Sequence, residues 1–318
     1  MSGINKIGSE NQLRLILKIP AYITSPISVK GKSNGKLNFT EMIDLVVDAV
    51  EKYNDSVEKI EIVKKNKAQS KQIKSINYYK SNYGDMPVIL LQISDFKTGM
   101  IDGYLEASER HNISNSDKLG SDTNFVLLYP QIVGDDNFSH YFLIFIYEDP
   151  GKENNEISSS VRQVLSKVLK LPMANIKLPK VLEEIKKAKV IDNINLNLYS
   201  SYNDNNSDMK LNKYVISSVT KIQKTITYAN VPAEEITNLI EEPLSADNKK
   251  KVLRFSSGEN KEVKITTEQK EDALNKISET VEELFNYEVE ISKTDPIYEV
   301  DFILKQIRPV VDKYLQNK

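Results

Sequence analysis

Three short apolar runs decide the fold: Pro87-Val-Ile-Leu-Leu-Gln-Ile-Ser-Asp95, Asn124-Phe-Val-Leu-Leu-Tyr-Pro-Gln-Ile-Val133 and His140-Tyr-Phe-Leu-Ile-Phe-Ile-Tyr147. Each run is rich in β-branched or aromatic residues and is bounded by turn-forming residues, which is typical of a buried strand. Gly134-Asp-Asp-Asn137 separates the last two runs, so these are predicted to form an antiparallel hairpin. The rest of the chain is expected to be arranged around the sheet that these strands build.

The flanking sequence predicts further strands and several helices. Asn38 and Glu41 form a capping-box pair that begins a helix with an apolar face as far as Tyr53. A second amphipathic pattern stops at Pro172, and shorter helices are expected from about Pro179 and Pro232. The additional predicted strands cover residues 13–19, 57–63, 100–105, 194–198, 214–228, 252–255 and 262–265.

Two helices are predicted to close the chain, over Thr267–Tyr287 and over Asp295–Leu315, the second with a kink at Pro309. The predicted fold class is α+β (mixed α/β), with a central mixed β-sheet and flanking helices. A smaller C-terminal α+β region follows and ends in the two helices. We place the boundary at residue 190, which gives an N-terminal domain over 1–190 and a C-terminal region over 191–318.

The composition excludes several chemistries. The 318 residues include no cysteine and two histidines, His111 and His140. A structural zinc site needs about four Cys or His ligands and is therefore excluded, as are cysteine nucleophiles, disulfides and iron–sulfur ligation by this chain. Neither histidine accompanies a serine in a nucleophile-elbow context, which disfavours Ser-His-Asp catalysis.

Charge and hydropathy give only general expectations. The 45 acidic and 43 basic residues nearly cancel, so net charge does not indicate a nucleic-acid partner. The longest apolar runs have about eight residues, far fewer than the roughly 20 that span a bilayer, and the first ten residues lack a signal-peptide core. We expect a soluble, cytoplasmic protein without a membrane partner, and its Lys/Asn/Ile-rich, cysteine-free composition fits an AT-rich bacterial genome.

The strongest functional signal is the basic segment, defined as residues 62–84, which contains six lysines and no acidic residue. Lysines can neutralise phosphates, and tyrosines can stack on exposed bases. The alternative interpretation is a solvated, lysine-rich helix face and loop. The predicted nucleic-acid contacts are Lys64, Lys65, Lys67, Lys71, Lys74, Tyr78, Tyr79 and Lys80.

A second signal lies at the end of the first apolar run. Asp95 and Lys97 are two residues apart and so share one face of a strand, and Asp85 stands just before that strand. A carboxylate pair with a lysine is how a Mg²⁺-dependent nuclease holds its metal and polarises a phosphate. These three residues are candidate catalytic groups, with Asp85 and Asp95 as Mg²⁺ ligands. The alternative is that Asp95 begins a turn.

These observations lead to three functional hypotheses. The first is a non-catalytic accessory protein, of the bacterial antiviral-defence kind, that binds nucleic acid or a nucleoprotein partner through the basic segment and needs no cofactor. The second is a Mg²⁺-dependent nuclease or phosphodiesterase that uses Asp85, Asp95 and Lys97. The third is a structural or oligomeric interaction protein, with the two C-terminal helices as a homo-oligomer interface.

Overall fold

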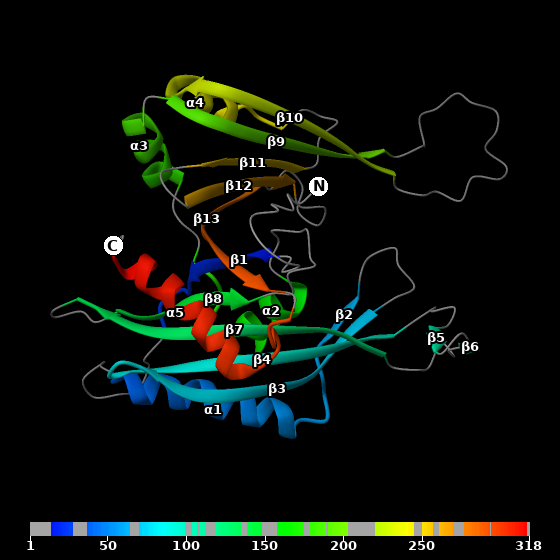
Figure 1. Cartoon of the computed structure of the whole chain (residues 1–318). Coiled ribbons are helices and arrows are strands. Elements are labelled where there is room, and N and C mark those ends of the chain that lie inside the picture. The colour runs from blue at the N-terminus through cyan, green and yellow to red at the C-terminus, as the bar shows by residue number, and fades with distance from the viewer. Residues whose placement is uncertain are drawn as a thin grey trace. The chain divides into compact units, whose positions relative to one another are not determined.

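The three apolar runs lie at the centre of a sheet in the computed structural model (Figure 1). They belong to β4 (Met86–Thr98), β7 (Leu119–Val133) and β8 (Ser139–Tyr147). β7 pairs with both of the other strands, in each case antiparallel, which confirms the predicted hairpin between the second and third runs. Leu90, Phe125 and Phe145 on these strands are almost completely buried.

The structure describes most of the chain, and the chain divides into two units. Unit 1 consists of Met1–Ala174 and Tyr287–Lys318, and unit 2 is Asn175–Asn286. The predicted boundary near residue 190 falls inside unit 2. The described residues are 14–27, 37–63, 70–98, 104–106, 109–111, 119–134, 139–147, 158–174, 178–188, 190–202, 220–244, 250–256, 261–269, 277–292 and 294–316.

The strands of unit 1 follow the order β13-β1-β8-β7-β4-β3-β2. The strands not yet named are β1 (Arg14–Ile23), β2 (Glu61–Val63), β3 (Ser70–Tyr83) and the end of β13 (Ile277–Ser292). β5 (Tyr104–Glu106) and β6 (Glu109–His111) form a separate antiparallel pair. The long hairpin of β3 and β4 turns at Gly84, whose φ of 60° lies in the left-handed region that favours glycine.

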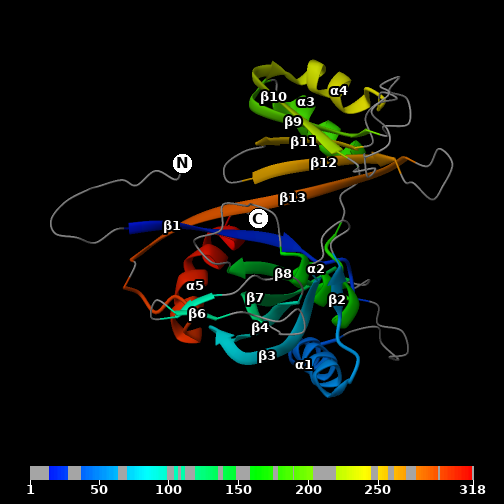
Figure 2. The same cartoon turned by 90° about the vertical axis from the view of Figure 1, so that its right-hand side faces the viewer.

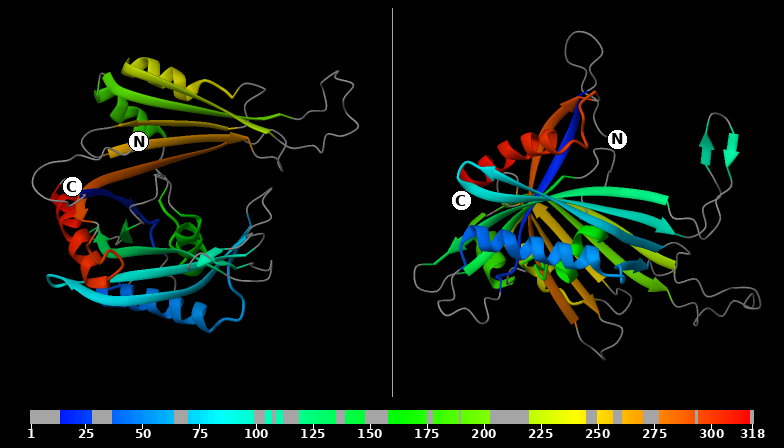
Figure 3. Two further views of the ribbon diagram at one scale, coloured as in Figure 1. Left: turned by 45° about the vertical axis from the view of Figure 1, so that its right-hand side comes forward. Right: turned by 90° about the horizontal axis from the view of Figure 1, so that it is seen from below.

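Helices cover both faces of the unit 1 sheet (Figures 2 and 3). α1 (Phe39–Asp55) begins at the predicted capping box, in which Asn38 accepts from the Glu41 amide at 2.8 Å. It lies on the face that carries Tyr78 and Lys80, because both of these side chains contact α1. α5 (Val300–Gln316) lies on the other face, where Tyr314 packs edge-on against Phe145.

The second amphipathic pattern of unit 1 forms a composite helix. α2 (Ser159–Gln163) continues directly into one π-helical turn, η1 (Val164–Val168), in which the Leu169 amide donates to the Val164 carbonyl at 3.0 Å. Such single π turns insert a residue into a helix and re-aim the side chains before and after it. Val161, Val164 and Leu165 are buried by the packing of this helix.

Unit 2 is an antiparallel sheet with two helices on one face (Figure 2). Its strand order is β10-β9-β11-β12-β13, and Ile236 of α4 and Ile185 of α3 belong to the same buried cluster as Leu253 in the sheet. The elements are α3 (Leu178–Ala188), β9 (Val190–Tyr202), β10 (Thr220–Pro232), α4 (Ala233–Glu241), β11 (Lys250–Ser256) and β12 (Lys261–Gln269).

The predicted fold class, α+β (mixed α/β) with a central mixed sheet, is wrong, because the described part is mostly antiparallel sheet with a few short helices. Every strand pairing for which the described residues give a register is antiparallel. More of the described residues lie in strands than in the five α-helices. Continuous apolar runs are common in parallel strands because helices bury both faces of a parallel sheet. Here α1 and α5 bury both faces of an antiparallel sheet, so its strands carry the same sequence pattern.

The predicted helix over Thr267–Tyr287 is also wrong, so the C-terminal region does not end in two helices. Residues 267–269 belong to β12, and residues 277–292 form β13. Val281 and Leu284 are three residues apart, which fits a helix face, yet they point to opposite faces of a strand and both are buried. Pairing with β12, which places Val281 opposite Ile265, overrides the local helical spacing.

No helix within the described ranges is long and apolar enough to cross a lipid bilayer.

Candidate functional site

Residues 70–83 of the basic segment form the strand β3, so the described part of the segment is neither a helix face nor one continuous basic surface. Lys64, Lys65 and Lys67 lie outside the described residues. Lys71 lies 3.7 Å from the Asp95 carboxylate, and Lys80 lies 3.0 Å from the Asp44 carboxylate of α1. Acidic residues distant in the sequence therefore partly compensate these two lysines. Lys74 is exposed at a register shift between β3 and β4.

The two tyrosines that we predict as base-stacking groups point to opposite faces of β3. Tyr78 donates its hydroxyl to Glu51 of α1 at 2.7 Å, and this hydrogen bond raises the pKa of the phenol. Tyr79 donates to the Gln92 side chain on β4 at 2.9 Å. Since neighbouring residues of a strand alternate between faces, the two rings do not form one stacking platform. Nucleic-acid binding by the basic segment stays a prediction.

The residues of the nuclease hypothesis are distributed along one hairpin. Asp85 is exposed in the β3–β4 turn, whereas Asp95 lies near the other end of β4 and is 4% exposed. Ten strand residues span about 30 Å, so the structure does not bring these carboxylates together. The side chain of Lys97 lies outside what the structure describes.

Asp95 instead belongs to a buried polar cluster beneath α2. Its carboxylate accepts a hydrogen bond of 2.5 Å from Ser160, and Lys71 lies on the same carboxylate oxygen. Asn124 is opposite Ile93, two residues from Asp95, and both atoms of its buried side-chain amide have no hydrogen-bond partner among the described residues. Because the carboxylate is buried and already engaged by two side chains, its geometry indicates a structural charge pair more than a reaction centre.

A different feature, which no sequence motif marks, lies at the edge of unit 2. β10 stands at the end of the strand order, and β9 is its only partner among the described strands. Its main-chain groups on the outer side therefore have no sheet partner there. Lys224, Thr225 and Thr227 are exposed along this strand, whereas Ile226 and Tyr228 are half-buried against the core of unit 2.

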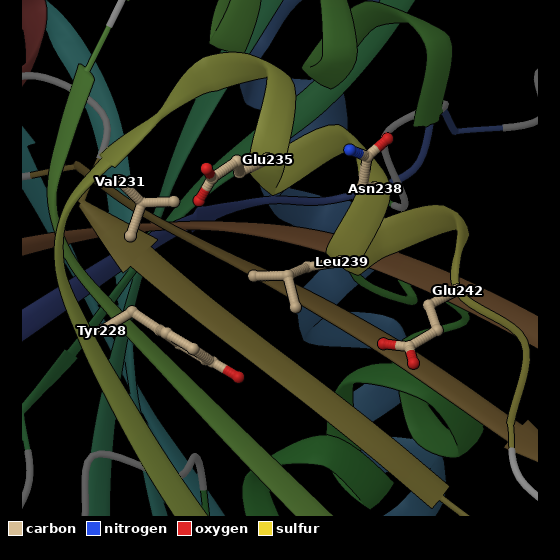
Figure 4. Close-up of a pocket in the computed structure, with 6 residues that line it drawn as sticks. All are labelled: Tyr228, Val231, Glu235, Asn238, Leu239 and Glu242. Atoms are coloured by element: carbon tan, nitrogen blue, oxygen red, sulfur yellow. The ribbon is translucent and has the colours of Figure 1, made fainter.

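A pocket of about 340 Å³ lies beside this edge, between β10 and α4 (Figure 4). Tyr228 and Val231 contribute from the strand side. The helix contributes residues at spacings of three and four, which form one stripe along it. In Figure 4, Leu239 extends from α4 toward the strand, and carboxylates lie on both sides of it. The helix residues are Glu235, Asn238, Leu239 and Glu242.

Two glutamates, Glu235 and Glu242, make the pocket acidic. Glu235 and Glu242 are both exposed, and in the part of the chain that the structure describes Glu235 has no ion-pair partner. The half-buried Tyr228 ring and Leu239 supply an apolar floor. An apolar floor with carboxylates at the rim suits a long side chain with a cationic end, because its methylenes and its charge are both accommodated.

Lys251 of β11 fixes the helical wall of the pocket. Its ammonium donates to the Leu239, Ile240 and Glu242 carbonyls, at 3.0, 3.0 and 2.5 Å, and so caps the C-terminus of α4. The side chain is 5% exposed, and this burial lowers the pKa of Lys251, while Glu242 and Glu279 act in the opposite direction. The cap holds Leu239 and Glu242 in place opposite Tyr228.

Comparisons of the chain with protein-family models, with curated proteins and with solved structures gave no match.

The sequence contains some signals for the two elements that form this pocket. Alternation over residues 214–228 predicts a strand there, and Pro232 predicts the start of the helix that follows it. Neither signal indicates that this strand lies at the edge of its sheet, because edge position depends on the order in which distant strands pair. The acidic stripe on α4 becomes a pocket wall only after the helix folds back beside Tyr228.

Proposed function

We propose that this chain is a protein-interaction module that binds an extended polypeptide segment by adding it as a strand to β10. The observation that carries the proposal is the open outer edge of β10 directly beside the pocket formed with α4. An unpaired edge supplies a row of main-chain donors and acceptors to a partner strand. This is the interaction-protein hypothesis, with the interface on unit 2 instead of the C-terminal helices.

The pocket gives such an edge a means of selecting its partner. In an added strand every second side chain projects toward the face that carries Tyr228 and α4. One of those side chains can enter the pocket, where Glu235 and Glu242 favour a positive charge. The proposed ligand is therefore an extended segment with Lys or Arg at a position that faces α4.

Synthetic peptides of defined sequence test this function. The probes are fluorescent nonapeptides of alternating Thr and Val with a central Lys, Glu or norleucine, and binding is measured by fluorescence anisotropy. We expect the Lys peptide to bind best and the Glu peptide to bind least. N-methylation of one alternate set of residues should abolish binding, while methylation of the other set should preserve it, because a strand pairs through alternate amides. Equal binding of all peptides, or no binding by the monomeric protein, would overturn the proposal.

A matched pair of variants tests the pocket. Glu235→Lys places a positive charge in the pocket, whereas Glu234→Lys makes the same change on a neighbouring exposed residue that does not line it. We expect the first variant to weaken binding of the Lys peptide about tenfold or more and to improve binding of the Glu peptide. The second variant should behave like the unaltered protein, and equal effects of the two would contradict a specific role for the pocket.

A further inference from the structure

We propose that a second copy of this chain occupies the edge of β10, in an antiparallel pairing centred on Ile226 that places Lys224 of each copy in the pocket of the other. This inference rests on the proposed strand addition and names its occupant. It requires that β10 supply both an open main-chain edge for strand pairing and a cationic side chain that the pocket of another copy can bind.

The spacing within β10 meets that requirement. If Ile226 pairs with Ile226 of the second copy, the residue two positions before it lies opposite the residue two positions after it. Lys224 of the second copy then lies directly opposite Tyr228, which lines the pocket with Glu235. Lys224 and Tyr228 are both an even number of residues from Ile226, so all three project to the same face of the strand.

The symmetry of the pairing preserves that face. Two identical strands pair antiparallel about a two-fold axis perpendicular to the sheet, so the face with α4 in one copy continues as the face with α4 in the other. α4 follows the C-terminal end of β10, at Pro232. The axis through Ile226 therefore places the two α4 helices over opposite halves of the strand pair.

Charge complementarity favours a second copy over an unrelated segment. Lys224 is exposed and has no ion-pair partner among the described residues, and the same is true of Glu235. The two-fold operation brings these two groups together twice. Like charges do not meet in this register, because Lys224 is opposite Tyr228 and never opposite Lys224.

The remaining contacts of the pairing are also favourable. Ile226 is half-buried at the edge, and its contact with Ile226 of the second copy would remove its remaining apolar surface from water on both sides. On the opposite face, Thr225 lies across from Thr227 of the second copy. Their hydroxyls already donate to Asn197 and Asn195 of β9, at 2.8 and 2.9 Å, so this pair contributes side-chain packing. The edge strand thus contains a complementary set of residues for its own two-fold copy.

Sedimentation velocity of the full chain across a concentration series tests the inference. We expect a concentration-dependent dimer, and we expect Lys224→Glu to raise its dissociation constant about tenfold or more. Lys187→Glu makes the same charge change at an exposed lysine of α3 that neither lines the pocket nor belongs to β10, and should leave the dimer unchanged. The double variant Lys224→Glu with Glu235→Lys should restore dimerisation, because it exchanges the charges without changing their pairing.

The outcomes separate this inference from the function on which it rests. A chain that stays monomeric at all concentrations but binds the Lys nonapeptide overturns the second-copy inference and leaves strand addition standing. A monomer that binds no peptide overturns both. A dimer that Lys224→Glu leaves intact, or a double variant that does not recover while each single variant remains folded by circular dichroism, overturns the proposed register.

Discussion

Tyr83 connects β3 to α5 through both its hydroxyl and its ring. The hydroxyl donates to Asp312, and the ring lies edge-on to Tyr129 with the Arg308 guanidinium 5.1 Å from its centre. Burial, followed by the hydrogen bond to Asp312, raises the pKa of Tyr83 to about 12. This residue therefore couples the stability of the fold to alkaline pH.

The sign of that coupling follows from the two pKa values. In the unfolded chain Tyr83 ionises near its ordinary pKa of 10.0, whereas in the folded chain it ionises near 12. Its contribution to stability is therefore complete below about pH 10 and is lost as the pH rises toward 12. We expect the difference in unfolding free energy between the unaltered protein and Tyr83→Phe to shrink across that interval, measured by urea titration.

Ser160 tests the structural interpretation of the buried Asp95 carboxylate. Ser160→Ala removes a hydroxyl donor from a fully buried acceptor, so we expect a loss of about 1 to 3 kcal/mol in unfolding free energy. Ser166→Ala on the same helix removes a hydroxyl that is exposed and donates to the Arg162 carbonyl. It should cost less than about 0.5 kcal/mol. Equal losses in the two variants would contradict the role of Ser160.

Local chemistry is the part of this molecule that the sequence predicts best. Asn38 and Glu41 form the capping box that their spacing indicates, because its partners are three residues apart. Asp95 has partners at positions 71 and 160, which no local pattern relates to it. The sequence therefore identifies Asp95 as unusual, whereas only the fold reveals that it is buried and paired.

At the scale of elements, Lys251 links the strand β11 to the end of α4, which forms one wall of the pocket. Lys251→Met keeps the aliphatic length but removes three hydrogen bonds to the last turn of the helix. We expect a loss of about 1 to 3 kcal/mol and faster amide exchange at the end of α4. Lys250→Met, at the preceding position of β11, should leave the exchange of α4 unchanged. Unchanged exchange in both variants would show that the helix does not need this cap.

The element that the sequence misassigns most clearly is β13. Its apolar residues have spacings that satisfy a helix, and nothing local contradicts that interpretation over residues 277–287. Pairing with a distant strand overrides this local spacing, because β12, which contains Val263 and Ile265, pairs with β13 at nine positions. By contrast, β4, β7 and β8 are predicted well because their turns and apolar runs lie close together in the sequence.

At the scale of the whole molecule, the order of strands determines which surfaces remain available. β10 pairs with β9 along almost its whole length, and its other side has no neighbour among the described strands. An edge this long is a site for pairing with another chain unless residues along it prevent this. The strand order depends on contacts between distant segments, and the position of the pocket depends on the strand order. The sequence pattern alone therefore reveals neither.

If two copies pair through this edge, folding and assembly become linked. A protein whose native state is a dimer gains stability with concentration, because mass action favours the associated folded state. We expect the thermal midpoint of the unaltered chain to rise by about 1 to 3 °C for each tenfold increase in concentration. The midpoint of Lys224→Glu should depend less on concentration over the same range, because its dimer is weaker, whereas the double variant with Glu235→Lys should regain the full dependence. Differential scanning calorimetry at three concentrations distinguishes these cases, and a midpoint that does not move for any of the three proteins would contradict linkage through β10.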